Sequence, residues 1–331
     1  MPLPSHHIPG GSFQNPWPGS QPLGATQLLR WFIERRTTRR PPPDPDPAVF
    51  GRMTPRLGQS PHGGIGITWI GHSTVLLEIG GLTVLTDPMW GDHASPVPMA
   101  RLRRWVPVPL PLESLPRVDL VLLSHNHYDH LDAPTIRRLA ALQPGIEWCV
   151  PLGLTATLRR LGVRHVHELD WWEEQSFGAA RVAATPAQHF SARGPLDRNR
   201  TLWCGFVLRA GGRAVYFAGD TAYHPEFAAI GNRFGPFDLQ LLPVGAYEPR
   251  WFMRIVHMNP EEAVRAYLEV GRGTARAADA SVMVPIHWGT FKLTDEPMDE
   301  PPRRTLAAWR SAGLPGDALW VLQHGETRNL L

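Results

Sequence analysis

The sequence predicts an α/β protein built as a four-layer αβ/βα sandwich, in which two sheets pack together and helices cover both outer faces. Three observations support this fold class. Short apolar runs typical of strands occur in both halves of the chain, segments with helical periodicity lie between them, and the strands outnumber the helices. The 331 residues are enough for one such layered domain preceded by a Pro-rich arm.

Residues 1–60 are predicted to form the arm, and residues 61–331 the main domain. Proline is dense in the arm, above all in "RRPPPDPDPAVF" (39–50). Such a run excludes both regular helix and central strand, because proline lacks the backbone N–H that these structures need. From Gly66 onward the pattern changes to alternating strands and helices.

One amphipathic helix is expected within the arm, over residues 26–40. Its apolar positions recur at helical spacing on one face, at Leu28, Leu29, Phe32 and Ile33. Two interpretations stay open. The stripe docks on the main domain, or it lies at a membrane surface with Trp31 beside it, where arginines meet anionic head groups. The arginines concerned are Arg35, Arg36, Arg39 and Arg40.

In the main domain, residues 67–88 predict two strands joined by a turn at Gly80-Gly81. Further strands are predicted, in chain order, at 118–124, 147–151, 181–189 (a strand running into a loop), 202–220 (a hairpin), 237–245, 281–289 and 318–326. Helices are predicted at 133–142 and 259–270.

Composition excludes several classes of protein. No run of about 18 apolar residues is present, so no transmembrane helix is predicted. The Pro/Gly-rich start lacks the apolar core of a secretory signal. Cys149 and Cys204 cannot build a disulfide framework, which favours a cytoplasmic location. The net charge of +3 is too small to indicate nucleic-acid binding.

Metal-seeking side chains are concentrated in "SHNHYDHLD" (124–132), directly after a predicted buried strand, and further candidates follow later strands. Strand ends hold side chains on a rigid scaffold and leave them open to substrate. Five imidazoles and two carboxylates can bind two divalent ions, and this ligand mixture suits zinc. The residues are His125, His127, Asp129, His130, His189, Asp220 and His287.

Isolated histidines indicate far less than this cluster does. His6, His7, His165 and His167 are interpreted as ordinary surface or core residues. The histidines of the cluster would suffer desolvation and mutual repulsion unless a cation compensated them.

The motif His125-Asn126-His127-Tyr128-Asp129-His130 resembles the HxHxDH signature of the metallo-β-lactamase fold superfamily, and the later ligands follow in the family's order. The resemblance implies the metallo-β-lactamase type of αβ/βα sandwich and two zinc ions per chain. It assigns His125, His127 and His189 to one ion. It assigns Asp129, His130 and His287 to the other, with Asp220 as the bridge.

Several longer segments are similar to those of the N-acyl-phosphatidylethanolamine-hydrolysing phospholipase D branch. They include "FQNPWP", "ELDWWEE", "TPAQHF", "FAGDTAY", "PVGAYEPRWFM", "HMNPEEAV" and "IHWGTF". The similarity implies hydrolysis of a phospholipid phosphodiester. Two zinc ions can lower the pKa of a shared water, and the resulting hydroxide would release phosphatidic acid and an N-acylethanolamine. The ligands alone also fit a lactonase, a β-lactamase-like enzyme or another phosphodiesterase.

Within this resemblance, Asp129 and Asp220 are expected to be catalytic, and Tyr128, His257 and Arg193 are expected to contact the substrate. An alternative for His257 is a structural place before a helix that begins with Asn259-Pro260. The branch carries a basic pair after the third metal motif, whereas "QHFSARG" keeps Arg193 beside Ala192.

His72 and Asp87 lie near strand ends outside the ligand set, and we expect them to orient ligating histidines. The expected partners are a phospholipid substrate, the inner face of a membrane as a peripheral surface, and a second copy of the chain in a homodimer. Nucleic acid is not an expected partner.

Overall fold

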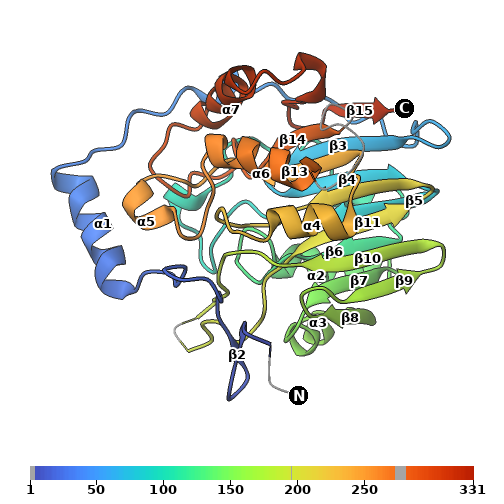
Figure 1. Ribbon diagram of the computed structural model, residues 1–331, viewed down its shortest axis with the longest axis horizontal. Helices are drawn as coiled ribbons and strands as arrows, with labels where there is room; N and C mark the ends of the chain where they lie inside the picture. The colour runs from blue at the N-terminus through green and yellow to red at the C-terminus, as the bar shows by residue number, and fades with distance from the viewer. Residues whose placement is uncertain (1–3, 195, 273–280) are drawn as a thin grey trace.

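The computed structural model describes residues 4–194, 196–272 and 281–331. In this part of the chain two sheets pack face to face, and helices cover the outer face of each (Figure 1). The predicted αβ/βα sandwich is therefore confirmed.

The first sheet has the strand order β15–β3–β4–β5–β6–β7–β8. Its strands are β3 (Ile65–Gly71), β4 (Thr74–Ile79), β5 (Leu82–Thr86), β6 (Leu120–Leu122), β7 (Glu147–Pro151), β8 (His165–Leu169) and β15 (Thr327–Leu330). Helices α2 (Ala133–Leu142) and α3 (Thr155–Arg160) cover its outer face. Their buried leucines and Ile136 pack in one apolar cluster with Val121 and Trp148 of the sheet.

The second sheet has the strand order β14–β13–β12–β11–β10–β9. Its strands are β9 (Glu174–Phe177), β10 (Ala180–Thr185), β11 (Gly205–Ala210), β12 (Arg213–Phe217), β13 (Leu239–Pro243) and β14 (Val282–Ile286). Helices α4 (Phe227–Phe234), α6 (Pro260–Arg272) and α7 (Glu300–Ser311) pack against one another on its outer side. The short helix α5 (Arg250–Met253) precedes α6.

Strand direction explains where the polar loops gather. β5 and β6 are parallel, and β3 has the same direction because β4 is antiparallel to both β3 and β5. By the same reasoning β10, β12 and β14 share a direction in the second sheet. The six strands therefore present their carboxyl ends at one end of the sandwich, and each is followed by a candidate site residue.

Two predicted elements differ from the structure. Residues 67–88 form three strands rather than two, because the chain turns a second time at His72, whose φ is 56°. The segment 318–326 is not a strand, since it contributes the single bridge Leu319–Met283 to the second sheet. The last strand is β15, which pairs with β3.

The arm adds a two-stranded hook, β1 (His7–Ile8) with β2 (Ser12–Phe13), then helix α1 (Ala25–Thr37) and a 3₁₀ turn, η1 (Pro47–Val49). In Figure 1 it runs from the hook, up the side where the six strands end, and across to β3. The hook pairs His6 and His7 with the two oxygens of Asp170, at 2.6 and 2.7 Å. His6 is buried and His7 is partly buried, as expected of ordinary core or surface residues, and the pair also tethers the arm to the main domain.

Helix α1 does not dock through its whole apolar stripe. Trp31 is 6% exposed and packs with Met253 and Val256, whereas Leu29 and Ile33 are 60% and 54% exposed. Trp31 also donates from Nε1 to Asp295 at 2.5 Å. Trp31 is the buried side chain of the helix, and Arg35 adds an ion pair with Asp295 at 3.3 Å. Most of the apolar stripe is exposed.

Candidate metal centre

The loop after β6 brings several ligands together within a few residues. The backbone N–H groups of His130 and Leu131 both donate to the carbonyl of His127, which turns the chain back on itself. Asp132 then begins α2 by accepting a hydrogen bond from the backbone N–H of Thr135. The motif is compact because it connects a strand directly to a capped helix.

A first group of ligands consists of His125, His127 and His189. His125 Nε2 lies 2.8 Å from His127 Nδ1, which lies 3.1 Å from His189 Nε2. His189 donates from Nδ1 to the carbonyl of Val256 at 2.8 Å, so its Nε2 carries a lone pair when the ring is neutral. The hydroxyl oxygen of Ser124, which donates its own proton to Asp87, lies 2.9 Å from Nδ1 of His125 and can accept a hydrogen bond from it. Three imidazoles thus aim their nitrogens at one point.

A second group consists of Asp129, His130 and His287. Asp129 Oδ2 lies 3.4 Å from His130 Nε2 and 3.5 Å from His287 Nε2. Asp220 lies between the two groups. Its Oδ2 is 3.1 Å from Nε2 of both His130 and His287, and 3.8 Å from Nε2 of His189. This is the position that a bridging carboxylate requires.

The electrostatics of the two groups are opposite. Burial lowers the pKa of His127 to about 3 and that of His189 to about 4, so both imidazoles are neutral at pH 7. For His287, burial opposes protonation, but Asp220 and Asp129 outweigh it and raise the pKa to about 9. The pKa of His130 is also raised, for the same reason, by Asp220, Asp129 and Asp87.

The donor set fits metal ions. Nε2 of His130, both ring nitrogens of His287 and Oδ1 of Asp220 are buried and have no hydrogen-bond partner within the described residues. Such atoms are costly to bury unless something satisfies them. Neutral imidazoles and ionised carboxylates are the ligands that zinc prefers. The seven residues expected from the sequence therefore converge on a site that two divalent cations can satisfy.

Asp87 and His72 orient members of this set. Asp87 Oδ2 accepts a hydrogen bond from His130 Nδ1 at 2.6 Å, and its Oδ1 accepts one from the backbone of Ser124 at 2.7 Å. His72 makes its side-chain hydrogen bond to a carboxylate, with its Nε2 2.9 Å from Asp129 Oδ2, and its ring lies 4.1 Å from that of His287. His72, Asp87 and His287 all have positive φ, a conformation that costs about 1–3 kcal/mol each and is typical of functional sites.

The three expected substrate contacts lie in two different places. His257 lies beside the ligands, with its ring 5.0 Å from that of His189 and 5.2 Å from that of His287. Tyr128 and Arg193 instead line a separate cavity, where the guanidinium stacks 3.9 Å from the Tyr128 ring. Arg193 also donates to the carbonyls of Asn126 and Leu131, so it braces the motif loop. Substrate contact by these residues stays a prediction.

The main cavity of the site has a volume of about 410 Å³ and is mostly apolar. Ligands lie at one side: His127, Asp129, His189 and Asp220. Apolar lining residues come from the arm and α5, including Leu23, Leu28, Trp31, Phe252 and Met253. Arg198 is the cation among the lining residues that the structure describes.

Comparison with known proteins gives the family. A model of the beta-lactamase superfamily domain matches residues 83–288, which include all seven candidate ligands. The chain belongs to the beta-lactamase superfamily. It is a metal-dependent hydrolase with the metallo-β-lactamase fold, and a metal-dependent hydrolase of Rubrobacter xylanophilus is 31% identical over 69% of this chain and 84% of its own length.

Other superfamily members are closer in sequence. An uncharacterised protein of Mycobacterium tuberculosis is 42% identical over 85% of this chain and 73% of its own length. N-acyl-phosphatidylethanolamine-hydrolyzing phospholipase D 1 of Caenorhabditis elegans is 42% identical over 70% of this chain and 65% of its own length. The yeast mitochondrial enzyme of that name, from Saccharomyces cerevisiae, is 35% identical over 73% of this chain and 52% of its own length. This chain therefore matches less than two thirds of either phospholipase.

Among solved structures, Igni18, a metallo hydrolase of Ignicoccus hospitalis, is 25% identical with a TM-score of 0.59. It covers 81% of this chain and 99% of its own. An isothiocyanate hydrolase from Delia radicum gut bacteria has a TM-score of 0.63 at 23% identity, over 80% of this chain and 98% of its own. The second likeness concerns the fold alone.

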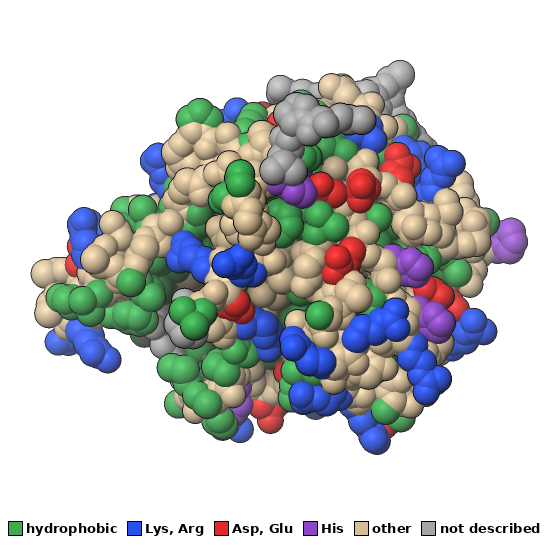
Figure 2. Space-filling model, turned by 90° about the horizontal axis from the view of Figure 1, so that it is seen from below, with side chains coloured by type: hydrophobic (Ala, Val, Ile, Leu, Met, Phe, Trp, Pro, Cys, Tyr) green, Lys and Arg blue, Asp and Glu red, His purple; other side chains and the backbone are tan. Residues whose placement is uncertain are grey.

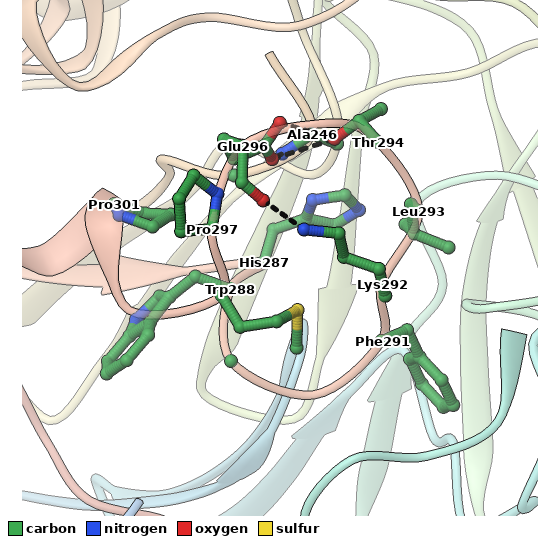
Figure 3. Close-up of a pocket in the computed structure, with 13 residues that line it drawn as sticks. Ala246, His287, Trp288, Phe291, Lys292, Leu293, Thr294, Glu296, Pro297 and Pro301 are labelled. Atoms are coloured by element: carbon green, nitrogen blue, oxygen red, sulfur yellow. Dashed lines mark hydrogen bonds between the residues drawn. The ribbon is translucent and has the colours of Figure 1, made fainter. Parts of the chain in front are cut away.

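Sequence reasoning missed the residues that connect the arm to this superfamily site. Lys292, the single lysine of the chain, donates to Asp44 of the arm and to the carbonyl of Glu296, each at 2.6 Å. Figure 3 shows Lys292 on the same loop as His287, turned toward Glu296. A lone lysine in a polar segment has no periodicity or spacing that would indicate this pairing. The one signal in the sequence is composition: Lys292 is the single lysine in a chain that otherwise uses arginine for its permanent positive charges.

Proposed function

We propose that the protein is a dinuclear zinc phosphodiesterase of the phospholipase D type, which converts an N-acylated phosphatidylethanolamine into phosphatidic acid and an N-acylethanolamine. The observation that carries the proposal is the cavity of about 410 Å³, which joins polar ligands to a mostly apolar wall. A phosphodiester with attached acyl chains has the same two-sided chemistry. The names of the two phospholipase relatives support the same substrate class.

The ligand sets for two zinc ions would be His125, His127 and His189 on one side and Asp129, His130 and His287 on the other, with Asp220 shared. Bound there, zinc supplies Lewis acidity at a phosphoryl oxygen and lowers the pKa of water to near neutrality.

Asp129 and Asp220 act as ionised carboxylates. Burial opposes their ionisation, yet neighbouring imidazoles hold the pKa of both well below the usual range. They can therefore offset positive charge in the site at all physiological pH values. His72 and Asp87 keep Asp129 and His130 in place through the hydrogen bonds described above.

His257 faces the cavity as a neutral imidazole, because burial lowers its pKa well below the usual value. It suits a hydrogen bond to the substrate better than delivery of a proton to the leaving group. The backbone of His257 is held by Arg250, which donates to its carbonyl at 3.1 Å and also pairs with Glu262.

The proposal includes a peripheral membrane surface, because a phospholipid substrate must be reached in a bilayer. The described residues contain no helix that is both long and apolar enough to cross a membrane. Helix α1 lines the cavity with Leu28 and exposes Leu29 and Ile33. Figure 2 shows hydrophobic and basic side chains together on the projecting part at the left, where α1 lies in Figure 1. Exposed apolar residues beside arginines are typical of interfacial helices.

The test combines metal analysis with four substrates: an N-acylated phosphatidylethanolamine, bis-p-nitrophenyl phosphate, an acyl-homoserine lactone and a cephalosporin. We expect about two zinc ions per chain and fastest hydrolysis of the phospholipid, with phosphatidic acid identified by mass spectrometry. Diacylglycerol as the product would mean that the other phosphorus–oxygen bond is cut. Faster lactone or cephalosporin hydrolysis would favour the corresponding alternative enzyme, and active protein with one ion or none would contradict the dinuclear site.

A further inference from the structure

A residue of the arm reaches the metal centre from 174 positions away in the sequence. The side-chain amide of Asn15 donates from Nδ2 to the backbone carbonyl of His189 at 2.9 Å and to that of Ser20, also at 2.9 Å. Asn15 is 2% exposed, so water does not compete for these bonds. A buried amide with both N–H groups engaged at fixed carbonyls is a rigid connector.

His189 is a ligand that depends on such support. β10 ends at Thr185, so His189 lies in an irregular segment rather than directly at the strand end. Its ring is fixed by the bond from Nδ1 to Val256, and the preceding Gln188 is fixed by a bridge to Ala222. The carbonyl of His189 itself is held by Asn15.

The arm is joined to this segment at two further places. The backbone N–H of Phe13 donates to the carbonyl of Asn199 at 2.9 Å, and Arg198 donates to the carbonyls of Pro22 and Leu23 at 3.3 Å. Residues 13–23 therefore run along the loop that carries His189, and Asn15 is the side chain in this contact that reaches the ligand.

We propose that Asn15 is a positioning residue for His189, through which the arm helps to hold a ligand of the metal centre in place. By holding the carbonyl of His189, it fixes the backbone from which the imidazole projects, and so the place of Nε2 relative to His125 and His127. The inference rests on the proposed zinc site. It predicts a selective effect: loss of Asn15 weakens the ion held by the three histidines and spares the ion held by Asp129, His130 and His287.

The experiment uses Asn15→Asp in the full chain, because aspartate keeps the shape of asparagine and has no N–H to donate when ionised. The matched control is Ser20→Ala. It loosens the same turn by removing a hydroxyl that donates to the carbonyl of Trp17 at 2.5 Å, and it does not touch His189. Zinc alone is the probe, measured by competition with a chromogenic chelator and by elemental analysis after dialysis. Melting of the chelator-treated proteins reports on the fold separately.

We expect Asn15→Asp to bind one of its two zinc ions about 10–100-fold more weakly than the wild type, the range typical for residues that orient metal ligands. That ion should be lost on dialysis. The second ion should bind as in the wild type, and Ser20→Ala should retain both. The added negative charge would by itself strengthen cation binding, so a weaker site identifies geometry as the cause. If Asn15→Asp does not fold, Asn15→Ala replaces it with the same expected result.

Unchanged affinity for both ions in the variant, equal weakening of both, or the same loss in Ser20→Ala would each overturn this inference alone. Wild-type protein that binds no zinc would instead overturn the proposed function, and this inference with it. The two failures are distinguished by the wild-type measurement.

Discussion

At the scale of single residues, protons and metal ions compete for His130 and His287. Carboxylates raise the pKa of both, that of His287 to about 9, while a metal needs neutral imidazoles. Protonated His287 stabilises the folded protein. This contribution is fully present below about pH 6.5, the ordinary pKa of histidine, and is lost as the pH rises through about 9. Zinc uptake at pH 7 should therefore release protons, and the apparent affinity should rise with pH up to about 9.

Isothermal titration calorimetry in two buffers with different ionisation enthalpies measures this release directly. A heat of zinc binding that is the same in both buffers at pH 7 would show that no protons leave. The pKa assignment for His130 and His287 would then be wrong.

Asp220 should matter to both ligand groups, since its Oδ2 lies 3.1 Å from His287 Nε2 and 3.8 Å from His189 Nε2. We expect Asp220→Ala to lower the affinity for each ion by at least about 10-fold and to reduce hydrolysis accordingly. Elemental analysis and chelator competition measure the effect. Asp317→Ala, at an exposed carboxylate, is the control and should bind metal as the wild type does. Loss of a single ion would show that Asp220 serves one group.

The role of a single residue can be predicted when its neighbours in the sequence form a recognisable motif. The spacing of His125, His127, Asp129 and His130 marks a metal motif within a few residues, and the structure brings these side chains together with His287. Asn15 lies in "FQNPWP", one of the segments similar to the phospholipase branch, but nothing in that segment indicates a contact with a metal ligand. Its role depends on a hydrogen bond that exists only after the arm has folded against a distant loop, and an Asn-Pro pair in a polar segment indicates a turn first.

At the scale of elements, α1 is the part of the molecule whose role a measurement can separate from catalysis. Leu29→Asp and Ile33→Asp change residues that are 60% and 54% exposed, so the fold should hold. Each side chain contributes about 1.5–3 kcal/mol when buried in an apolar phase, so the double variant should weaken vesicle binding by at least about 100-fold. Sedimentation with anionic phospholipid vesicles measures it.

The control for this pair is hydrolysis of bis-p-nitrophenyl phosphate, which needs no membrane and should stay near the wild-type rate. Unchanged vesicle binding, or a variant that no longer folds, would show that α1 is not the membrane-facing element.

Elements were predictable where one signal dominated. Residues 133–142 read as a helix and form α2 with the same bounds, because apolar periodicity and an Asp132 cap agree. Residues 67–88 read as two strands and form three, because the single Gly71 beside His72 is a weaker turn signal than the Gly80-Gly81 pair. For α1, periodicity shows that an apolar stripe exists but not what covers it, so the sequence leaves both interpretations of the helix open.

At the scale of the whole molecule, the arm behaves as a strap over the end of the sandwich that carries the site (Figure 1). Its second half is anchored by Asp44, which accepts hydrogen bonds from Lys292 and from the backbone N–H of Met298. Lys292→Met removes the cation and leaves a mostly buried carboxylate without it. We expect a loss of about 1–3 kcal/mol in the free energy of unfolding and faster proteolysis within residues 38–60.

Thermal melting and limited proteolysis with mass spectrometry measure these two effects. Asp46→Asn is the control, because asparagine can still accept the hydrogen bond from Ala48 that begins η1. Cleavage of Lys292→Met at the wild-type rate would mean that the strap is held by its other contacts.

The two walls of the cavity have different origins in the chain, and this has an evolutionary consequence. The ligands come from segments that follow strands of the sandwich, whereas Leu23, Ala25 and Leu28 come from the arm. Mutations in that segment can reshape the space beside the metals at little risk to the fold. A lineage can thus explore new substrates by changing these lining residues, while the ligands, and Asn15 that holds His189, stay unchanged.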